Sequence, residues 1–438
     1  MHYGCLEKLN MLKKSVVTLI LLFITNITIA KTLTMKLDSL DIIAQEYVKL
    51  SLSIGQHHSS YIDAYYGPKE WEPTGKPIPL QSLLETTRHL IRTIEEIEIP
   101  ENEKQRAEFL SIQLKGADVF IRMQLGEKVL FDDESKELYD AVSPTLDLAS
   151  FDKTLAELEA LFPGEEPLNQ KMKAFDEIFV IPTEKLDTVF VAAITEARER
   201  TKQHINLPAN ESFKIEYVTN KVWSGYNWYK GNNFSVIQLN TDFPIYINRA
   251  IDLASHEGYP GHHVFNSQME QHLVNNNGWI EYSVYPLFSP MSLLAEGSAN
   301  YGIEVTFPHD ERIKFEKEVL FPLAGIDPEL VEKYYQVDGI KQKLSYIDNY
   351  VAKHYLDGKI DKEQAIELLM KYALTSREKS TQRIGFIEAN RSYVINYNLG
   401  QDIVKAYVSE LAGEDPNKRW QVFAELLAFP KTASMMTK

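Results

Sequence analysis

The stretch that most constrains this chain is the octapeptide from His256 to His263, which reads HEGYPGHH. It follows residues 247–255, where apolar side chains recur every three or four positions and predict an amphipathic helix. A helix that ends in His-Glu, with further histidine close behind, is how zinc hydrolases present two imidazoles and a base to one ion. The octapeptide therefore predicts one half of a zinc site.

The histidine spacing departs from the usual H-E-x-x-H pattern, because Pro260 stands at the fourth position after His256. In an unbroken helix His256 and His263 would lie about 10 Å apart along the axis, too far to bind one ion. Pro260 forces a kink, and a two-residue excursion there would bring His262 into place. We predict His256 and His262 as zinc ligands, with His263 in reserve. Glu257 is then the base that takes a proton from the attacking water.

The third ligand is predicted on a later helix that opens at Ser289-Pro290, because serine caps helix N-termini and proline suits the first helical position. Glu296 lies there among apolar and small residues. A carboxylate buried in such a stretch either faces a cation or carries a heavy desolvation penalty. We therefore predict Glu296 as the third ligand; the alternative is a solvated helix residue. Gly297 costs helix stability, which indicates close approach of another helix or a ligand.

Three further polar residues are candidates for supporting roles. Asp252 and Glu304 could orient the histidines, although a solvated surface acid is the simpler interpretation of each. Tyr397 lies in a long predicted helix, residues 377–399, and its hydroxyl could stabilise the oxyanion that forms when a carbonyl is attacked. A core tyrosine is the competing interpretation.

The residue patterns predict a mainly α protein of the α+β class. Helical spacing covers most of residues 37–205, whereas residues 213–218 and 234–239 alternate as strands do. These strands predict a small antiparallel or mixed sheet beside the metal helix. Its edge could accept an extended peptide as a further strand, or the strands could simply cover the core. We expect an N-terminal helical region at 31–205 and a catalytic region at 206–438, with a soft border that could be one continuous unit.

The N-terminus predicts export. Lys13 and Lys14 precede an apolar run at residues 16–24, and the small residues Thr28 and Ala30 suit cleavage after Ala30. The run is too short to favour a membrane span, and an uncleaved anchor is the alternative. We expect a signal peptide over residues 1–30 and a periplasmic or secreted protein with no stable membrane anchor after cleavage.

Composition narrows the chemistry. A formal net charge of −16 at pH 7 argues against nucleic acid as a partner, because binding phosphates requires a basic face. The only cysteine, Cys5, lies in the predicted signal, which leaves His, Glu and Asp as metal ligands. Cys5 also precedes the apolar run, so it is not a lipid-modified residue at the cleavage point.

These motifs together resemble the bacterial "domain of unknown function 885" family. The resemblance rests on the octapeptide, on Ala295-Glu296-Gly297 and on residues 61–68 (YIDAYYGP), 240–244 (NTDFP) and 396–401 (NYNLGQ). It covers almost the whole chain after the predicted signal. That family is similar to the zincin metallopeptidases, so the resemblance implies a helical zincin-like fold and zinc-dependent peptide hydrolysis. The site residues it implies are His256, Glu257, His262 or His263, and Glu296. Many members carry histidine where this chain has Lys341, a departure that bears on activity or specificity.

The sequence thus predicts an exported zinc metallopeptidase that acts on a peptide or small amide. One alternative is a hydrolase with the same site and a non-peptide amide or ester substrate. The other is a metal-free binding or scaffold protein on a protease fold.

Overall fold

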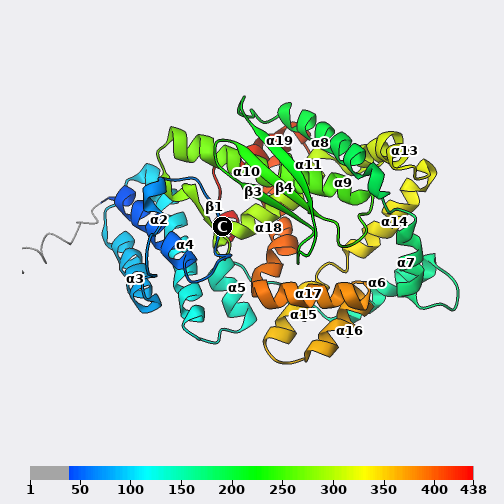
Figure 1. The fold of residues 1–438 in the computed structure, drawn as a ribbon, viewed down its shortest axis with the longest axis horizontal. Helices are drawn as coiled ribbons and strands as arrows, with labels where there is room; N and C mark the ends of the chain where they lie inside the picture. The colour runs from blue at the N-terminus through cyan, green and yellow to red at the C-terminus, as the bar shows by residue number, and fades with distance from the viewer. Residues whose placement is uncertain (1–38, 438) are drawn as a thin grey trace, which may run out of the picture.

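The computed structural model describes residues 39–437, so the predicted signal peptide and its cleavage point lie outside the described residues. Within this range the protein is mainly helical with two small sheets, one of them mixed (Figure 1). The prediction of a mainly α protein with a small sheet is confirmed. The helices of the first half are α2 (Leu40–Gly55), α3 (Leu80–Glu96), α4 (Lys104–Gln124), α5 (Phe131–Tyr139), α6 (Leu148–Leu161), α7 (Leu168–Glu177) and α8 (Leu186–Lys202).

The second half holds most of the segments that line the pocket. Its helices are α9 (Asn248–Leu253), α10 (His262–Met269), α11 (Pro290–Thr306), α12 (His309–Phe315), α13 (Phe321–Ala324), α14 (Val331–Gln342), α15 (Ile347–Leu356), α16 (Lys362–Tyr372), α17 (Arg377–Asn390), α18 (Ile395–Ala412), α19 (Pro416–Ala428) and α20 (Ala433–Met436). In Figure 1, α2, α3 and α4 lie at one end of the molecule, whereas α6, α7 and α14 lie at the other. The regions proposed at 31–205 and 206–438 stay a prediction.

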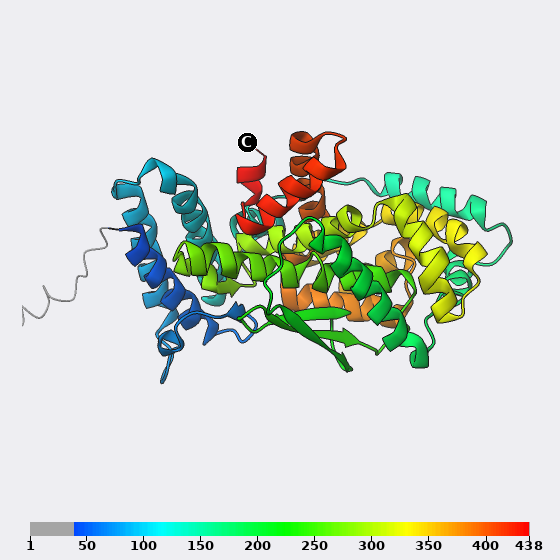
Figure 2. The same ribbon diagram turned by 90° about the horizontal axis from the view of Figure 1, so that it is seen from above.

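The larger sheet has the strand order β2 (Ser212–Val218), β4 (Phe234–Asn240), β3 (Gly225–Tyr229). Strand β2 runs parallel to β4, and β3 runs antiparallel to it, so β3 is an edge strand. Strands β2 and β4 match the two predicted strands, whereas β3 forms in an aromatic stretch for which the sequence predicts no strand. Figure 2 shows this sheet along one side of the central helices. A second sheet pairs β1 (Ile62–Tyr65) with β5 (Val284–Pro286) antiparallel.

Helices α11 and α18 cross at the centre of the fold. A Cβ atom on Gly297 of α11 would lie 2.4 Å from backbone atoms of Gly400 in α18. Real Cβ atoms do not approach backbone so closely, so the crossing depends on glycine in α11. The close approach predicted from Gly297 is confirmed, and its partner is a helix.

The single long helix predicted over residues 377–399 is wrong. Helix α17 ends at Asn390, a 3₁₀ turn covers Arg391–Val394, and α18 then runs on past Gly400. The break is at Arg391, whose φ of 52° lies in the left-handed region and interrupts the helical backbone. A guanidinium nitrogen of Arg391 lies 2.7 Å from a carboxylate oxygen of Glu134 in α5, and this ion pair holds the turn in place.

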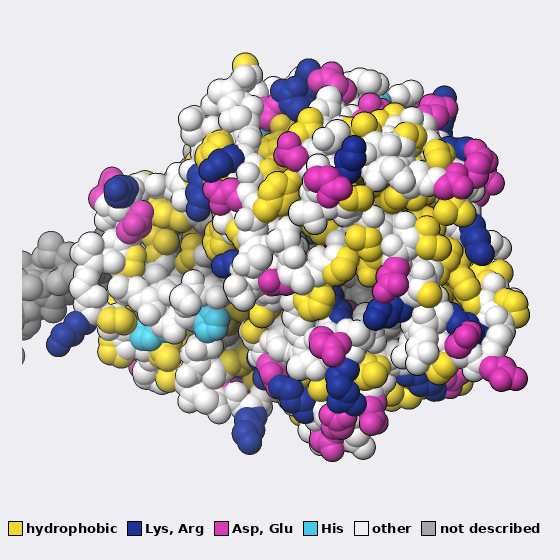
Figure 3. Space-filling model, turned by 45° about the vertical axis from the view of Figure 1, so that its right-hand side comes forward, with side chains coloured by type: hydrophobic (Ala, Val, Ile, Leu, Met, Phe, Trp, Pro, Cys, Tyr) yellow, Lys and Arg dark blue, Asp and Glu magenta, His cyan; other side chains and the backbone are white. Residues whose placement is uncertain are grey.

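The described surface carries both charges. On the face drawn in Figure 3, Lys and Arg side chains are interspersed with Asp and Glu. Within residues 39–437, no helix has both the length and the apolar character needed to cross a membrane.

Candidate metal centre

The helical backbone is interrupted within the octapeptide. Helix α9 continues into a π-helical turn, Ala254–Gly258, and α10 begins at His262. The predicted interruption at Pro260 is therefore confirmed. A Cβ atom on Gly261 would lie 1.9 Å from the carbonyl oxygen of His256, so glycine is required where the two helix ends meet. The result is that His256 and His262 approach each other from opposite sides of the break.

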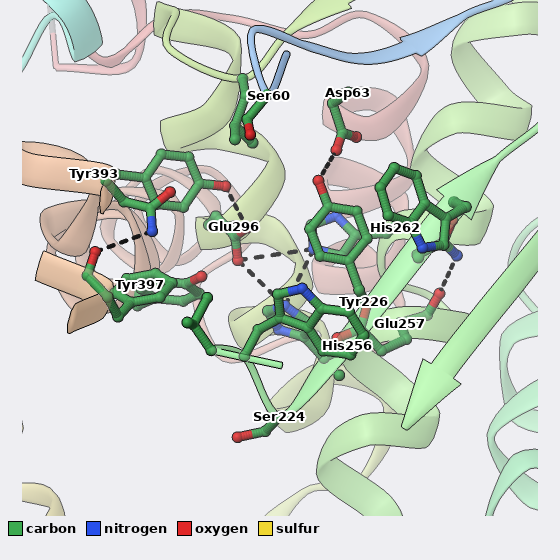
Figure 4. Close-up of a pocket in the computed structure, with 18 of the residues that line it drawn as sticks. Ser60, Asp63, Ser224, Tyr226, His256, Glu257, His262, Glu296, Tyr393 and Tyr397 are labelled. Carbon is green, nitrogen blue, oxygen red and sulfur yellow. Dashed lines mark hydrogen bonds and ion pairs between the residues drawn. The ribbon is translucent and has the colours of Figure 1, made fainter. Parts of the chain in front are cut away.

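Three nitrogen and oxygen atoms converge at this point (Figure 4). The Nε2 atoms of His256 and His262 are 3.1 Å apart. Helix α11 brings Glu296 to them, with Oε2 3.2 Å from Nε2 of His256 and 3.7 Å from Nε2 of His262. Glu257 is the fourth member: one ligand atom each of His256, Glu257 and His262 lie within 4.8 Å of one another. These residues form a candidate metal-binding group.

The spacing of the three atoms fits a tetrahedral zinc site. Donor atoms that bind zinc at about 2.0–2.2 Å lie about 3.3–3.6 Å from one another. The three measured separations, 3.1, 3.2 and 3.7 Å, scatter around that range. Oε2 of Glu296 is also buried and has no hydrogen-bond partner among the described residues. A buried carboxylate oxygen without a donor is costly, and a cation between it and the imidazoles removes the cost.

The neighbouring side chains orient these atoms. The hydroxyl of Tyr393 donates to Oε1 of Glu296 at 2.6 Å, which leaves Oε2 facing the histidines. Asn300 donates its amide N–H to the carbonyl of Tyr397 at 2.8 Å, so its Oδ1 faces Nδ1 of His256, also at 2.8 Å. Because Oδ1 only accepts hydrogen bonds, Nδ1 of His256 carries the proton and Nε2 presents a lone pair. The sequence gives one indication that Asn300 could lie at the site: it stands one helical turn after Glu296, on the same face of the helix.

We expect Asn300→Leu to weaken zinc binding by about 10–100-fold, the usual effect of removing a partner that orients a histidine ligand. Competition with a chromogenic zinc chelator measures this directly. Asn300→Asp is the comparison: a carboxylate still accepts from Nδ1 of His256, although it loses the hydrogen bond to Tyr397, so it should bind zinc more tightly than Asn300→Leu does. Equal zinc affinity in Asn300→Leu and the unaltered protein would contradict the orienting role.

The electrostatics of the group favour a positive charge at its centre. Burial alone would raise the pKa of the Glu296 carboxyl, but the two neighbouring histidines lower it well below its usual range. Burial lowers the pKa of His262, yet Glu296, Glu257 and Asp63 outweigh this and raise it to about 9. The carboxylates therefore draw a proton onto His262. A metal ion would take the place of that proton.

Glu257 and Tyr397 line the same cavity, which has a volume of about 810 Å³. Glu257 is 4% exposed, and its burial raises the pKa of the carboxyl, against the pull of His256 and His262. The hydroxyl of Tyr397 makes no hydrogen bond to another described residue, whereas that of Tyr393 is committed to Glu296. Tyr397 thus has a free donor in the cavity.

Asp63 was not predicted as part of the pocket. It lies on β1, in the aromatic segment 61–68, and accepts a hydrogen bond from Tyr226 of β3 (Figure 4). Burial raises the pKa of Asp63 to about 6, although the Tyr226 hydrogen bond and His262 lower it. The sequence around Asp63 has no helix or strand periodicity that would indicate a site residue. Asp63 is brought to the pocket by β1, which pairs with β5 from a distant part of the chain.

The remaining candidates lie apart from the group. Both ring nitrogens of His263 are engaged, one with Ser235 at 2.8 Å and the other with Glu211 at 3.1 Å, because His263 points away from its helical neighbour His262. Neither Asp252 nor Glu304 contacts a histidine of the group. Asp252 lies 2.7 Å from Arg312, and Glu304 lies 2.6 Å from Lys405. Lys341 lies 3.0 Å from Asp176, outside the pocket lining.

No protein-family model matches the chain, and no curated protein does. Membership of the domain-of-unknown-function 885 family therefore stays a prediction. The fold is similar to the crystal structure of a candidate lipoprotein from Colwellia psychrerythraea, with a TM-score of 0.53 and 16% identity over 84% of this chain and 70% of that chain. A candidate lipoprotein of unknown function from Shewanella oneidensis matches with a TM-score of 0.47 and 12% identity over 82% of this chain and 72% of that one. The likeness to the Colwellia protein shows a shared fold.

Proposed function

We propose that this protein is an exported zinc metallopeptidase of zincin type, related to the domain-of-unknown-function 885 family. The observation that carries the proposal is the buried, unpartnered Oε2 of Glu296, which lies within 3.7 Å of the Nε2 atoms of His256 and His262. In this proposal these three residues hold the ion. Glu257, the adjacent buried acid, is left to act on the substrate.

When bound, zinc supplies a Lewis acid that lowers the pKa of water to about 7. Glu257 accepts the proton of the attacking water and later passes it to the leaving amine. The raised pKa of its carboxyl suits this shuttle, since a carboxylate with a raised pKa accepts a proton more readily than an ordinary glutamate does. The hydroxyl of Tyr397 donates a hydrogen bond to the oxyanion that develops on the attacked carbonyl.

The pocket suits an extended peptide. Edge strand β3 lines it, and among the described strands β3 pairs only with β4. The other side of β3 can therefore add a substrate strand through backbone hydrogen bonds. This observation favours a peptide over a small amide or ester, which would gain nothing from a strand edge. Export accords with the lipoprotein descriptions of the two structural neighbours and with the predicted signal at residues 1–30.

The proposal is tested by metal content. We expect the protein dialysed against zinc to retain about one equivalent, measured by mass spectrometry of the metal. His256→Ala and Glu296→Gln should each lose most of it, because the first removes a donor atom and the second replaces an anionic oxygen by a neutral amide, a weaker zinc ligand. His89→Ala, an exposed histidine outside the pocket, is the matched control and should retain the metal. A protein that takes up no zinc supports a metal-free scaffold and overturns the proposal, and zinc uptake with cleavage of esters alone supports the other hydrolase.

A further inference from the structure

Three cations lie in the cavity of the candidate metal centre. Arg249 is on α9, and Lys379 and Arg383 are on successive turns of α17; all three line the pocket. They influence one another: burial lowers the pKa of Lys379 first, and Arg383 and Arg249 lower it further. Helices α9 and α17 therefore hold like charges close together, which is unfavourable for any of these cations that lacks an anionic partner.

The two arginines have carboxylate partners, whereas the lysine does not. Arg383 lies 2.7 Å from Asp348, and Arg249 lies 3.4 Å from Asp252. Lys379 makes no ion pair with any described carboxylate; its amino group donates to Gln382 at 2.9 Å and lies 4.3 Å from the centre of the Phe243 ring. Asp242 acts on Lys379 electrostatically without pairing with it. Lys379 is thus a half-buried cation with unused donors in the pocket.

The cations adjoin the proposed catalytic groups. Arg249 contributes to lowering the pKa of Glu257, and Arg383 does the same for Tyr397. An anion held at Lys379 would therefore lie in the same cavity as the base and the oxyanion donor, on the side formed by α9 and α17. The acids Asp63, Glu257 and Glu296 act on His262 of the candidate metal centre instead. Asp252, a fourth acid in the lining, pairs with Arg249. Lys379 is therefore the lining cation that has no carboxylate partner among the described residues.

We propose that Lys379, supported by Arg249 and Arg383, binds a carboxylate of the substrate. This inference rests on the proposed peptidase function and adds a substrate class to it, namely peptides with a carboxylate close to the scissile bond. That carboxylate comes either from the free C-terminus or from an acidic side chain. The ammonium group of Lys379 can bind a carboxylate from either source, because its N–H donors rotate and do not require one fixed orientation of the carboxylate.

Three versions of one labelled peptide distinguish these sources: a free C-terminal acid, the C-terminal amide, and the amide with glutamate as the last residue. We expect the unaltered protein to cleave at least one carboxylate version with a kcat/KM at least about tenfold above that of the plain amide. Lys379→Gln should remove this preference by raising KM for the carboxylate versions more than for the plain amide. Lys379→Arg should restore it in part. Lys128→Gln, an exposed lysine outside the pocket, is the control.

Binding of the same peptides to Glu257→Gln, measured by fluorescence anisotropy, separates the two proposals. If the unaltered protein cleaves no peptide, but Glu257→Gln binds a carboxylate version and loses this binding when Lys379→Gln is added, the peptidase proposal fails and the anion site stands. If all three are cleaved and bound equally well, or if Lys379→Gln affects all three equally, the anion site is wrong and the peptidase proposal stands. Absence of both binding and cleavage overturns the two together.

Discussion

Glu257→Gln is expected to lower kcat/KM for peptide hydrolysis by about 10²–10⁴-fold, the usual contribution of a general base, and to leave the zinc content unchanged. Glutamine keeps the size of the side chain but cannot accept the proton of the attacking water. The Glu257 carboxylate packs closely against β3, since a Cβ atom on Gly225 would lie 2.9 Å from it. Glutamine has nearly the same size and shape and fits this space. The substitution should therefore remove the charge without changing the packing.

The measurement pairs steady-state kinetics with metal analysis of the same sample, because Glu257 is also within ligand distance of His256 and His262. Joint loss of zinc and activity would show that Glu257 holds the ion, which leaves Glu296 as the base. Glu304→Gln is the matched control: it makes the same chemical change on α11, where Glu304 pairs with Lys405 outside the pocket lining. Full activity in Glu257→Gln would contradict a catalytic role for this residue.

The residues of the candidate site that the sequence indicates are those whose geometry depends on local spacing. A proline in the interior of a helix interrupts it, so the approach of His256 and His262 follows from seven consecutive residues, 256–262. Glu296 stands out because an acid in an apolar helix needs a partner. Each of these signals is contained in a single segment of chain.

The residues that the sequence does not indicate depend on contacts between distant segments. Asn300 acquires its role only because α18 offers the carbonyl of Tyr397, and Tyr393 reaches Glu296 from the 3₁₀ turn that precedes α18. Strand β3 exists because β4 pairs with it, since its own aromatic residues carry no strand alternation. The break at Arg391 depends on Glu134 from α5, more than two hundred residues earlier. Such partners are set by tertiary packing, which local periodicity does not encode.

Gly297→Ala is expected to lower the free energy of unfolding by about 1–3 kcal/mol, the usual cost of overpacking a filled core. Helix propensity alone predicts the opposite sign, because alanine stabilises a helix interior over glycine by about 0.5–1 kcal/mol. The clash decides: the added Cβ would lie 2.4 Å from the backbone of Gly400, which cannot move without shifting α18. Urea denaturation followed by circular dichroism measures the difference.

The same substitution should also disturb the candidate site, because Glu296 directly precedes Gly297 on α11 and its partner Tyr393 lies in the 3₁₀ turn that leads into α18. We therefore expect Gly297→Ala to lose zinc affinity as well as stability. Gly339→Ala is the matched control: Gly339 is exposed in α14, and an added Cβ would meet no atom within 4 Å, so helix propensity should make this variant more stable. If both variants were stabilised alike, α11 and α18 would not be in the close contact described, and Glu296 would lack the packing that holds it against the histidines.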